Sequence, residues 1–134
     1  MSVEGPTPTS RREARERALE LAYEAEIRNW TVDQLLQSLV LEAEPLTETL
    51  LRSAEDQKDK AESLIAGRAK GWTLARMPVI DRLVMRLAVA EMLTATTPTG
   101  VILSEAVDLA TRYSTDESGR FVNGVLAAIA RDLG

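Results

Sequence analysis

The chain has 134 residues, which is enough for one domain with a hydrophobic core of its own, and aromatic residues make up only 4% of it. It contains no cysteine and no histidine, which excludes disulfides, thiolate chemistry and an ordinary Ser-His-Asp site and removes the commonest metal ligand. The formal net charge of −5 argues against a surface that is basic throughout, as general nucleic-acid binding would require.

Residues 1–9 contain two prolines and one glycine, and they predict a disordered leader before a single helical domain over residues 10–134. They lack the apolar stretch of a signal peptide. The longest apolar run, residues 83–93, is interrupted by Arg86 and Glu91 and is too short to span a membrane. We therefore expect a cytoplasmic protein that makes no membrane contact.

The first helix is predicted over residues 11–28, because Ser10 and Glu13 have the spacing of a capping box. Its apolar stripe is narrow and consists mostly of alanines, so a neighbouring helix can approach it closely. The same stripe could pack against a second copy of the chain. A monomer and a homodimer are therefore both open at this stage.

Three arginines, Arg11, Arg12 and Arg15, lie at the start of this helix, where the helix dipole disfavours each cation by about 0.3–1 kcal/mol. At about 100° per residue they cover roughly a quarter of the helix surface. This arrangement favours an anionic partner such as a phosphate backbone. A solvated face with local ion pairs to Glu13 and Glu16 explains the same pattern about equally well.

Five more helices are predicted, each with an apolar face of helical periodicity. They begin at Thr31, which has the capping-box spacing to Gln34, at Leu46, at Pro78, after a turn at residues 96–100, and at Ser114, which has that spacing to Glu117. The wholly polar stretch at residues 55–60 predicts a bend in the helix that contains it. No segment alternates with period two, so we expect an all-α fold, a compact bundle of about six helices.

In the last predicted helix, Gly124 follows Asn123, and a glycine inside a helix costs about 1 kcal/mol relative to alanine. We expect Gly124 at a point where another helix crosses closely. The role of Asn123 in a polar contact stays open on this evidence.

A basic island lies in the middle of the sequence. Residues 63–90 carry five basic side chains against Asp81 alone, whereas residues 31–62 carry eight acids against three bases. Arg76 and Arg82 belong to this island, and they can join the N-terminal arginines in space. Such an uneven distribution of charge is more informative than the net charge of the chain.

No catalytic or cofactor-binding pattern is present in the sequence. The carboxylates fall on solvated helix faces, and residues 67–71 contain two glycines and a lysine but lack the Gly-Lys-Ser/Thr ending of a phosphate loop. We therefore expect a protein that is not an enzyme and that uses no cofactor and no metal.

Five sequence blocks span most of the chain from Arg11. They are Arg11-Arg12-x-Ala14-Arg15-Glu16-x-Ala18-Leu19, Trp72-Thr73-Leu74-x-Arg76-Met77, Ile80-Asp81-Arg82-x-x-x-Arg86-Leu87-Ala88, Glu105-Ala106-Val107-x-Leu109-Ala110 and Phe121-Val122-Asn123-Gly124-Val125-Leu126. In this order they resemble the NusB family of transcription antitermination factors. The last block together with the second and third is specific, whereas the arginine block alone is weak.

The resemblance implies an all-helical fold of two three-helix subdomains and a role without catalysis. Members of the family bind the boxA element of ribosomal RNA leader transcripts together with NusE, a small-subunit ribosomal protein. This complex helps RNA polymerase to pass terminators. The resemblance therefore implies single-stranded boxA-type RNA, NusE and the RNA polymerase antitermination complex as partners.

The resemblance also implies two sets of RNA-binding residues. The arginine-rich start of the first helix contacts RNA in the family, and the start of the last helix contributes as well. The matching residues in this chain are Arg11, Arg12 and Arg15 in the first set and Glu117, Phe121 and Asn123 in the second.

Recognition of unpaired RNA needs cations that bind phosphates and groups that reach or stack on bases. The three N-terminal arginines, with Arg76 and Arg82, supply the cations, and Phe121 supplies a stacking plane, although a phenylalanine in a helix is more often part of the core. Three to five phosphate contacts predict a log–log salt slope of roughly −2 to −4 for single-stranded RNA. Such binding is weak alone, which fits a factor that needs a protein partner.

Two other functions compete with this one. The acidic balance of the chain is typical of a helical protein-interaction adaptor with little RNA binding of its own. An RNA-modifying enzyme ranks last, because NusB-like folds also occur as domains attached to RNA methyltransferases but this sequence contains no cofactor-binding region.

Overall fold

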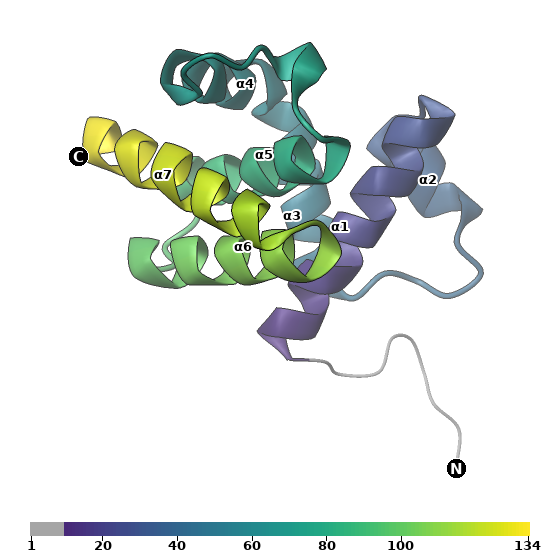
Figure 1. Cartoon of the computed structure of the whole chain (residues 1–134). Coiled ribbons are helices and arrows are strands. Elements are labelled where there is room, and N and C mark those ends of the chain that lie inside the picture. Colours follow the sequence, from purple (N-terminus) through teal and green to yellow (C-terminus); the bar gives the residue numbers. More distant parts are fainter. Residues whose placement is uncertain (1–9) are drawn as a thin grey trace.

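The computed structural model describes residues 10–134, and the leader predicted over residues 1–9 lies outside the described residues. The described part contains seven α-helices, one short 3-10 helix and no strand, which confirms the all-α fold (Figure 1). The limits of the helices are α1 Arg11–Arg28, α2 Val32–Ser38, α3 Pro45–Asp56, α4 Lys58–Arg68, η1 Leu74–Arg76, α5 Val79–Thr94, α6 Thr99–Tyr113 and α7 Asp116–Leu133. None of these helices combines the length and the apolar character that crossing a bilayer requires.

Two hydrophobic clusters form the core, and α1 contributes to both. The smaller cluster joins α1, α2 and α3 around Leu21 and Leu35. The larger cluster joins α4, α5, α6 and α7 around Met85 and Leu126, and Leu19 of α1 packs into it. The smaller cluster corresponds to a three-helix subdomain, whereas the larger one contains four helices. The alanine stripe of α1 faces this core, so it is not free to pack against a second copy of the chain.

The additional helix arises at Gln57, inside the polar stretch where the sequence predicted a bend. Gln57 ends α3 and precedes α4. Leu50 and Leu51 of α3 pack into the smaller cluster, whereas Ala61 and Ile65 of α4 pack into the larger one. The chain passes from one cluster to the other at this point, so the single long helix predicted from Leu46 is in fact two helices.

The capping boxes predicted for α1 and α2 are both present, with the reciprocal hydrogen bonds between side chain and backbone. At α7 the prediction was one residue early, because Oγ1 of Thr115 accepts the cap hydrogen bond from the backbone N–H of Ser118 at 3.0 Å. Ser114 instead ends α6, and its hydroxyl oxygen accepts a hydrogen bond from Ser118 Oγ at 3.0 Å. The turn is therefore short, and α6 and α7 run side by side (Figure 1).

The close approach between α6 and α7 occurs at Gly119. A Cβ atom at Gly119 would overlap Oγ1 of Thr111, whereas a Cβ atom at Gly124 would meet nothing within 4 Å. Thr111 Oγ1 donates a hydrogen bond to the carbonyl oxygen of Val107 at 2.8 Å, which holds it in this position. The expectation that Gly124 marks a helix crossing was therefore wrong, because Gly124 faces solvent.

These contacts predict opposite effects for two substitutions on the same helix. We expect Gly119→Ala to lower the free energy of unfolding by about 1–3 kcal/mol, because the added methyl group forces α6 and α7 apart. Gly124→Ala, the matched control, should raise it by roughly 0.5–1 kcal/mol through helix propensity. Urea unfolding followed by circular dichroism measures both. Adding Thr111→Ala to Gly119→Ala should recover part of the loss, and equal effects at the two glycines would contradict this account of the packing.

Candidate nucleic-acid interface

The start of α1 presents two arginines to solvent. Arg11 is exposed and forms no ion pair with any residue that the structure describes. Arg12 is 55% exposed, and its Nη2 lies 2.6 Å from Oδ2 of Asp108 on α6. Burial raises the pKa of Asp108, but hydrogen bonds from Arg112 and Arg12 outweigh it and hold that pKa below its ordinary value. The Arg12–Asp108 ion pair therefore places the start of α1 beside α6.

Arg15, the third arginine of the predicted set, is buried. Its side chain is 8% exposed, and its guanidinium binds both carboxylate oxygens of Glu91 on α5, with Nη2–Oε2 at 2.5 Å and Nε–Oε1 at 3.3 Å. This bidentate pair occupies the donors that a phosphate would need. The expectation that Arg15 contacts RNA is therefore corrected. Helical periodicity predicts the face of α1 on which Arg15 lies, but it does not reveal that the buried Glu91 of α5 binds this side chain.

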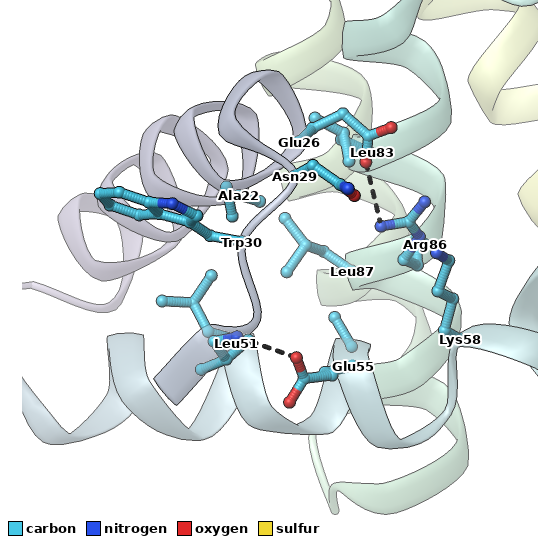
Figure 2. Close-up of a pocket in the computed structure, with 13 residues that line it drawn as sticks. Ala22, Glu26, Asn29, Trp30, Leu51, Glu55, Lys58, Leu83, Arg86 and Leu87 are labelled. Carbon is cyan, nitrogen blue, oxygen red and sulfur yellow. Dashed lines mark hydrogen bonds and ion pairs between the residues drawn. The ribbon is translucent and has the colours of Figure 1, made fainter. Parts of the chain in front are cut away.

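Arg82 is also engaged inside the protein. Its side chain is 16% exposed, and its Nη2 lies 3.2 Å from Oε2 of Glu26 on α1. Arg86, one turn later, pairs with the same Glu26 and, at 2.7 Å, with Glu62 of α4. Figure 2 shows Glu26 and Arg86 in the wall of a cavity between α1, α3 and α5. Acids from other helices thus neutralise this part of the basic island, and Arg82 is not an available phosphate contact.

The first turns of α7 carry the other predicted residues, on two edges of the helix. Glu117 and Asn123 are exposed, and Asn123 lines a shallow depression beside α6 together with Arg120. Phe121, one turn after Glu117, lies on the opposite edge of the helix from Asn123 and is partly buried against the larger cluster. Its ring centroid is 6.2 Å from that of Trp72, with a tilt of 60° between the planes. The predicted residues of α7 therefore do not share a single face.

The start of α7 connects with the start of α1 through α6. Asp108 binds Arg12, and Thr111, about one turn later on α6, lies against Gly119 of α7. This arrangement brings Arg120, which follows Gly119, to the side of the molecule where Arg12 lies. The sequence reasoning missed Arg120, although it is the only basic residue in the first half of the last helix.

Some exposed cations of the candidate surface have no ion-pair partner, as is also true of Lys58, Lys60 and Arg131 elsewhere in residues 10–134. Arg11, Arg76 and Arg120 are exposed and form no ion pair within residues 10–134, whereas Arg15 and Arg82 are paired with acids. Such cations can bind anions at no cost in broken ion pairs. In the part of the chain that the structure describes, no group of three acidic side chains is arranged to hold a metal ion.

Asp81, in the first turn of α5, supports the start of α7 from inside the protein. It is 3% exposed, and its Oδ1 has no hydrogen-bond partner. Burial raises the pKa of Asp81, and hydrogen bonds from the hydroxyls of Ser118 and Ser114 only partly oppose this effect. A buried carboxyl that is incompletely hydrogen-bonded is stabilised in its neutral form.

Comparison with known proteins gives this geometry a family context. A family model described as the NusB family matches residues 12–131. The transcription antitermination protein NusB of Thermobifida fusca (strain YX) is 42% identical over 125 residues, which cover 90% of this chain and 88% of that protein. The NusB protein of Saccharopolyspora erythraea is 41% identical over 128 residues, which cover 90% of this chain and 86% of that protein.

Solved structures extend the similarity to three dimensions. T. maritima NusB matches with a TM-score of 0.84 and 30% sequence identity, over 94% of each chain. A crystal structure of the antitermination factors NusB and NusE in complex with dsRNA contains a chain that matches with a TM-score of 0.77 and 27% identity, over 91% of this chain and 96% of that chain.

The buried position of Arg15 predicts a large effect on stability. We expect Glu91→Ala to lower the free energy of unfolding by about 3–5 kcal/mol, because it leaves the Arg15 guanidinium buried without a partner. The matched control is Glu24→Ala, which breaks the exposed pair with Arg28 and should cost at most about 0.5 kcal/mol. Urea unfolding curves measure both, and similar losses in the two variants would contradict the structural role of Arg15.

The raised pKa of Asp81 predicts a distinct dependence of stability on pH. Its contribution is present while the carboxyl is protonated and is lost as the pH rises through its folded-state pKa. The stability of Asp81→Asn relative to the unsubstituted protein should therefore increase as the pH rises above the ordinary pKa of an aspartate, about 4. Urea unfolding at a series of pH values tests this. A stability curve for Asp81→Asn that runs parallel to that of the unsubstituted protein would refute the prediction.

Proposed function

This chain belongs to the NusB family, and we propose that it is a transcription antitermination factor that binds boxA-type single-stranded RNA of ribosomal RNA transcripts. In this proposal it binds the RNA together with NusE, as part of an antitermination complex on RNA polymerase. Its contribution is to bind and orient the RNA, and no chemical step is assigned to it.

The observation that carries the proposal is the position of Arg11 and Arg12 at the start of α1. A cation there is disfavoured by the helix dipole, and Arg11 forms no ion pair within residues 10–134. An exposed and uncompensated guanidinium at this position gains most from an anionic ligand, and phosphates accept its donors in the same way as carboxylates. The similarity to NusB chains, one of them in a complex with NusE and dsRNA, supports NusE and an RNA as partners.

The residues at the start of α7 complete the proposed surface. Arg120 adds a third exposed cation next to α6, the helix that Arg12 contacts, and Asn123 beside it offers an amide that can hydrogen-bond to a base edge. Glu117 is an exposed acceptor for base amino groups. Phosphate contacts by the three arginines predict a salt slope of roughly −2 for single-stranded RNA. RNA binding through so few phosphate contacts is weak, which fits a factor that needs a protein partner.

The salt dependence of RNA binding tests the assignment of the arginines. We expect Arg11→Ala with Arg12→Ala to weaken binding of a labelled boxA-type RNA, in the presence of NusE, and to reduce the steepness of the log–log salt slope by about 1.4. The matched control is Arg28→Ala with Arg131→Ala, which removes the same charge from exposed arginines at the far ends of α1 and α7. Equal slopes in the two double variants would refute the assignment.

An adaptor with little RNA binding of its own is the second candidate function. One observation favours it: Tyr23 and Ile27, one turn apart on α1, are 42% and 64% exposed, as expected for residues that contact a protein. The titration described above separates the two functions. Capture of NusE by a protein that gives no RNA shift even at low salt would establish the adaptor and exclude the RNA-binding function.

A further inference from the structure

The connection between α4 and α5 places a tryptophan at the surface, beside the start of α7. Trp72 is 47% exposed, and its ring lies against that of Phe121 with 6.2 Å between the centroids. Large aromatic side chains that remain half exposed in a folded domain lose much of the free energy that burial would supply. The position of Trp72 therefore calls for a physical reason.

The backbone on both sides of Trp72 prevents its burial. Ala69 before it is 3% exposed and Met77 after it is 4% exposed, so both ends of the connection are anchored in the core. Gly71 has a φ of +77°, and the backbone N–H of Trp72 donates to the carbonyl oxygen of Ala69 at 3.0 Å. Leu74 packs against the larger cluster in its place. The connection is thus a tight turn that holds the indole outward.

Unpaired cations are close neighbours of both aromatic residues along the chain. Lys70 and Arg76 lie on either side of Trp72 in the same connection, and Arg120 directly precedes Phe121. All three are exposed and form no ion pair with the residues that the structure describes. Aromatic rings interleaved with free cations are the composition that single-stranded nucleic acid requires, because bases stack on the rings while the cations hold the adjoining phosphates.

We propose that Trp72, supported by Phe121, is a stacking site for an unpaired RNA base and that Lys70 and Arg76 bind the flanking phosphates. This inference rests on the proposed RNA-binding function, and it extends the RNA path from α1 across α7 to the connection between α4 and α5. Phe121 is half buried, so its ring forms the wall of the site, and the exposed face of the indole receives the base.

Fluorescence tests the stacking directly, because Trp72 and Trp30 are the only tryptophans. Trp30 packs against the smaller cluster at the far end of α1, with the guanidinium of Arg28 over its ring, so Trp30→Phe leaves Trp72 as the sole reporter. We expect a single-stranded boxA-type oligonucleotide, with NusE present, to quench this fluorescence. The same sequence in a blunt duplex, with its bases already stacked, should quench it much less.

Binding measurements on variants separate stacking from charge. We expect Trp72→Ala to weaken binding roughly 10- to 100-fold with an unchanged salt slope, and Trp72→Phe to retain more of the affinity. Lys70→Ala with Arg76→Ala should instead reduce the steepness of the slope by about 1.4. Trp30→Phe should bind like the unsubstituted protein, and thermal unfolding confirms that each variant is folded.

The outcomes distinguish this inference from the function on which it rests. If the unsubstituted protein binds no RNA with or without NusE, the proposed function and the stacking site both fail. If it binds RNA, but Trp72 is not quenched and Trp72→Ala binds equally well, only the stacking site fails. Loss of NusE capture by Trp72→Ala with RNA binding intact would show that the aromatic pair contacts a protein, and it would also overturn the inference.

Discussion

The buried ion pair between Arg15 and Glu91 is the contact on which the arrangement of the candidate site depends. It joins α1 to α5 across the boundary between the two hydrophobic clusters. A well-packed apolar pair could stabilise the fold equally well, so the distinct contribution of the ion pair is the orientation that its two hydrogen bonds impose. With Arg15 fixed, Arg11 and Arg12 one turn earlier must project beyond the core, where Arg12 meets Asp108 of α6.

The distribution of charge in the folded chain differs from its distribution along the sequence. Arg68, Arg82 and Arg86 of the basic island pair with acids from other helices, so most of the island is neutralised. Seven of the sixteen basic side chains are exposed and form no ion pair within residues 10–134, namely Arg11, Lys58, Lys60, Lys70, Arg76, Arg120 and Arg131. In an acidic protein such cations attract anions only at short range, so anion binding is favoured where several of them lie close together, and its affinity falls as the salt concentration rises.

The start of α7 is held from three sides, and this explains why it can serve as a binding surface. Gly119 lets α6 approach until Thr111 is in contact, and the serine hydroxyls at the turn lie beside the buried carboxyl of Asp81. On the other edge the ring of Phe121 packs against Trp72. The backbone of a helix fixed in this way loses little further entropy when a ligand binds.

The sequence by itself determined the helical class, the limits of α1, the two capping boxes, the bend near Gln57 and the family resemblance that the comparisons confirmed, because these depend on local patterns of residues. It also indicated the exposed position of Arg11. Only the tertiary structure decided which arginines are free, since Arg15 and Glu91 are separated by 75 intervening residues and their pairing leaves no local signal. The same holds for Gly119 and Trp72, whose roles follow from the helix or ring that packs against them. Periodicity assigns a residue to a face of its helix, but the packing of the helices decides what that face meets.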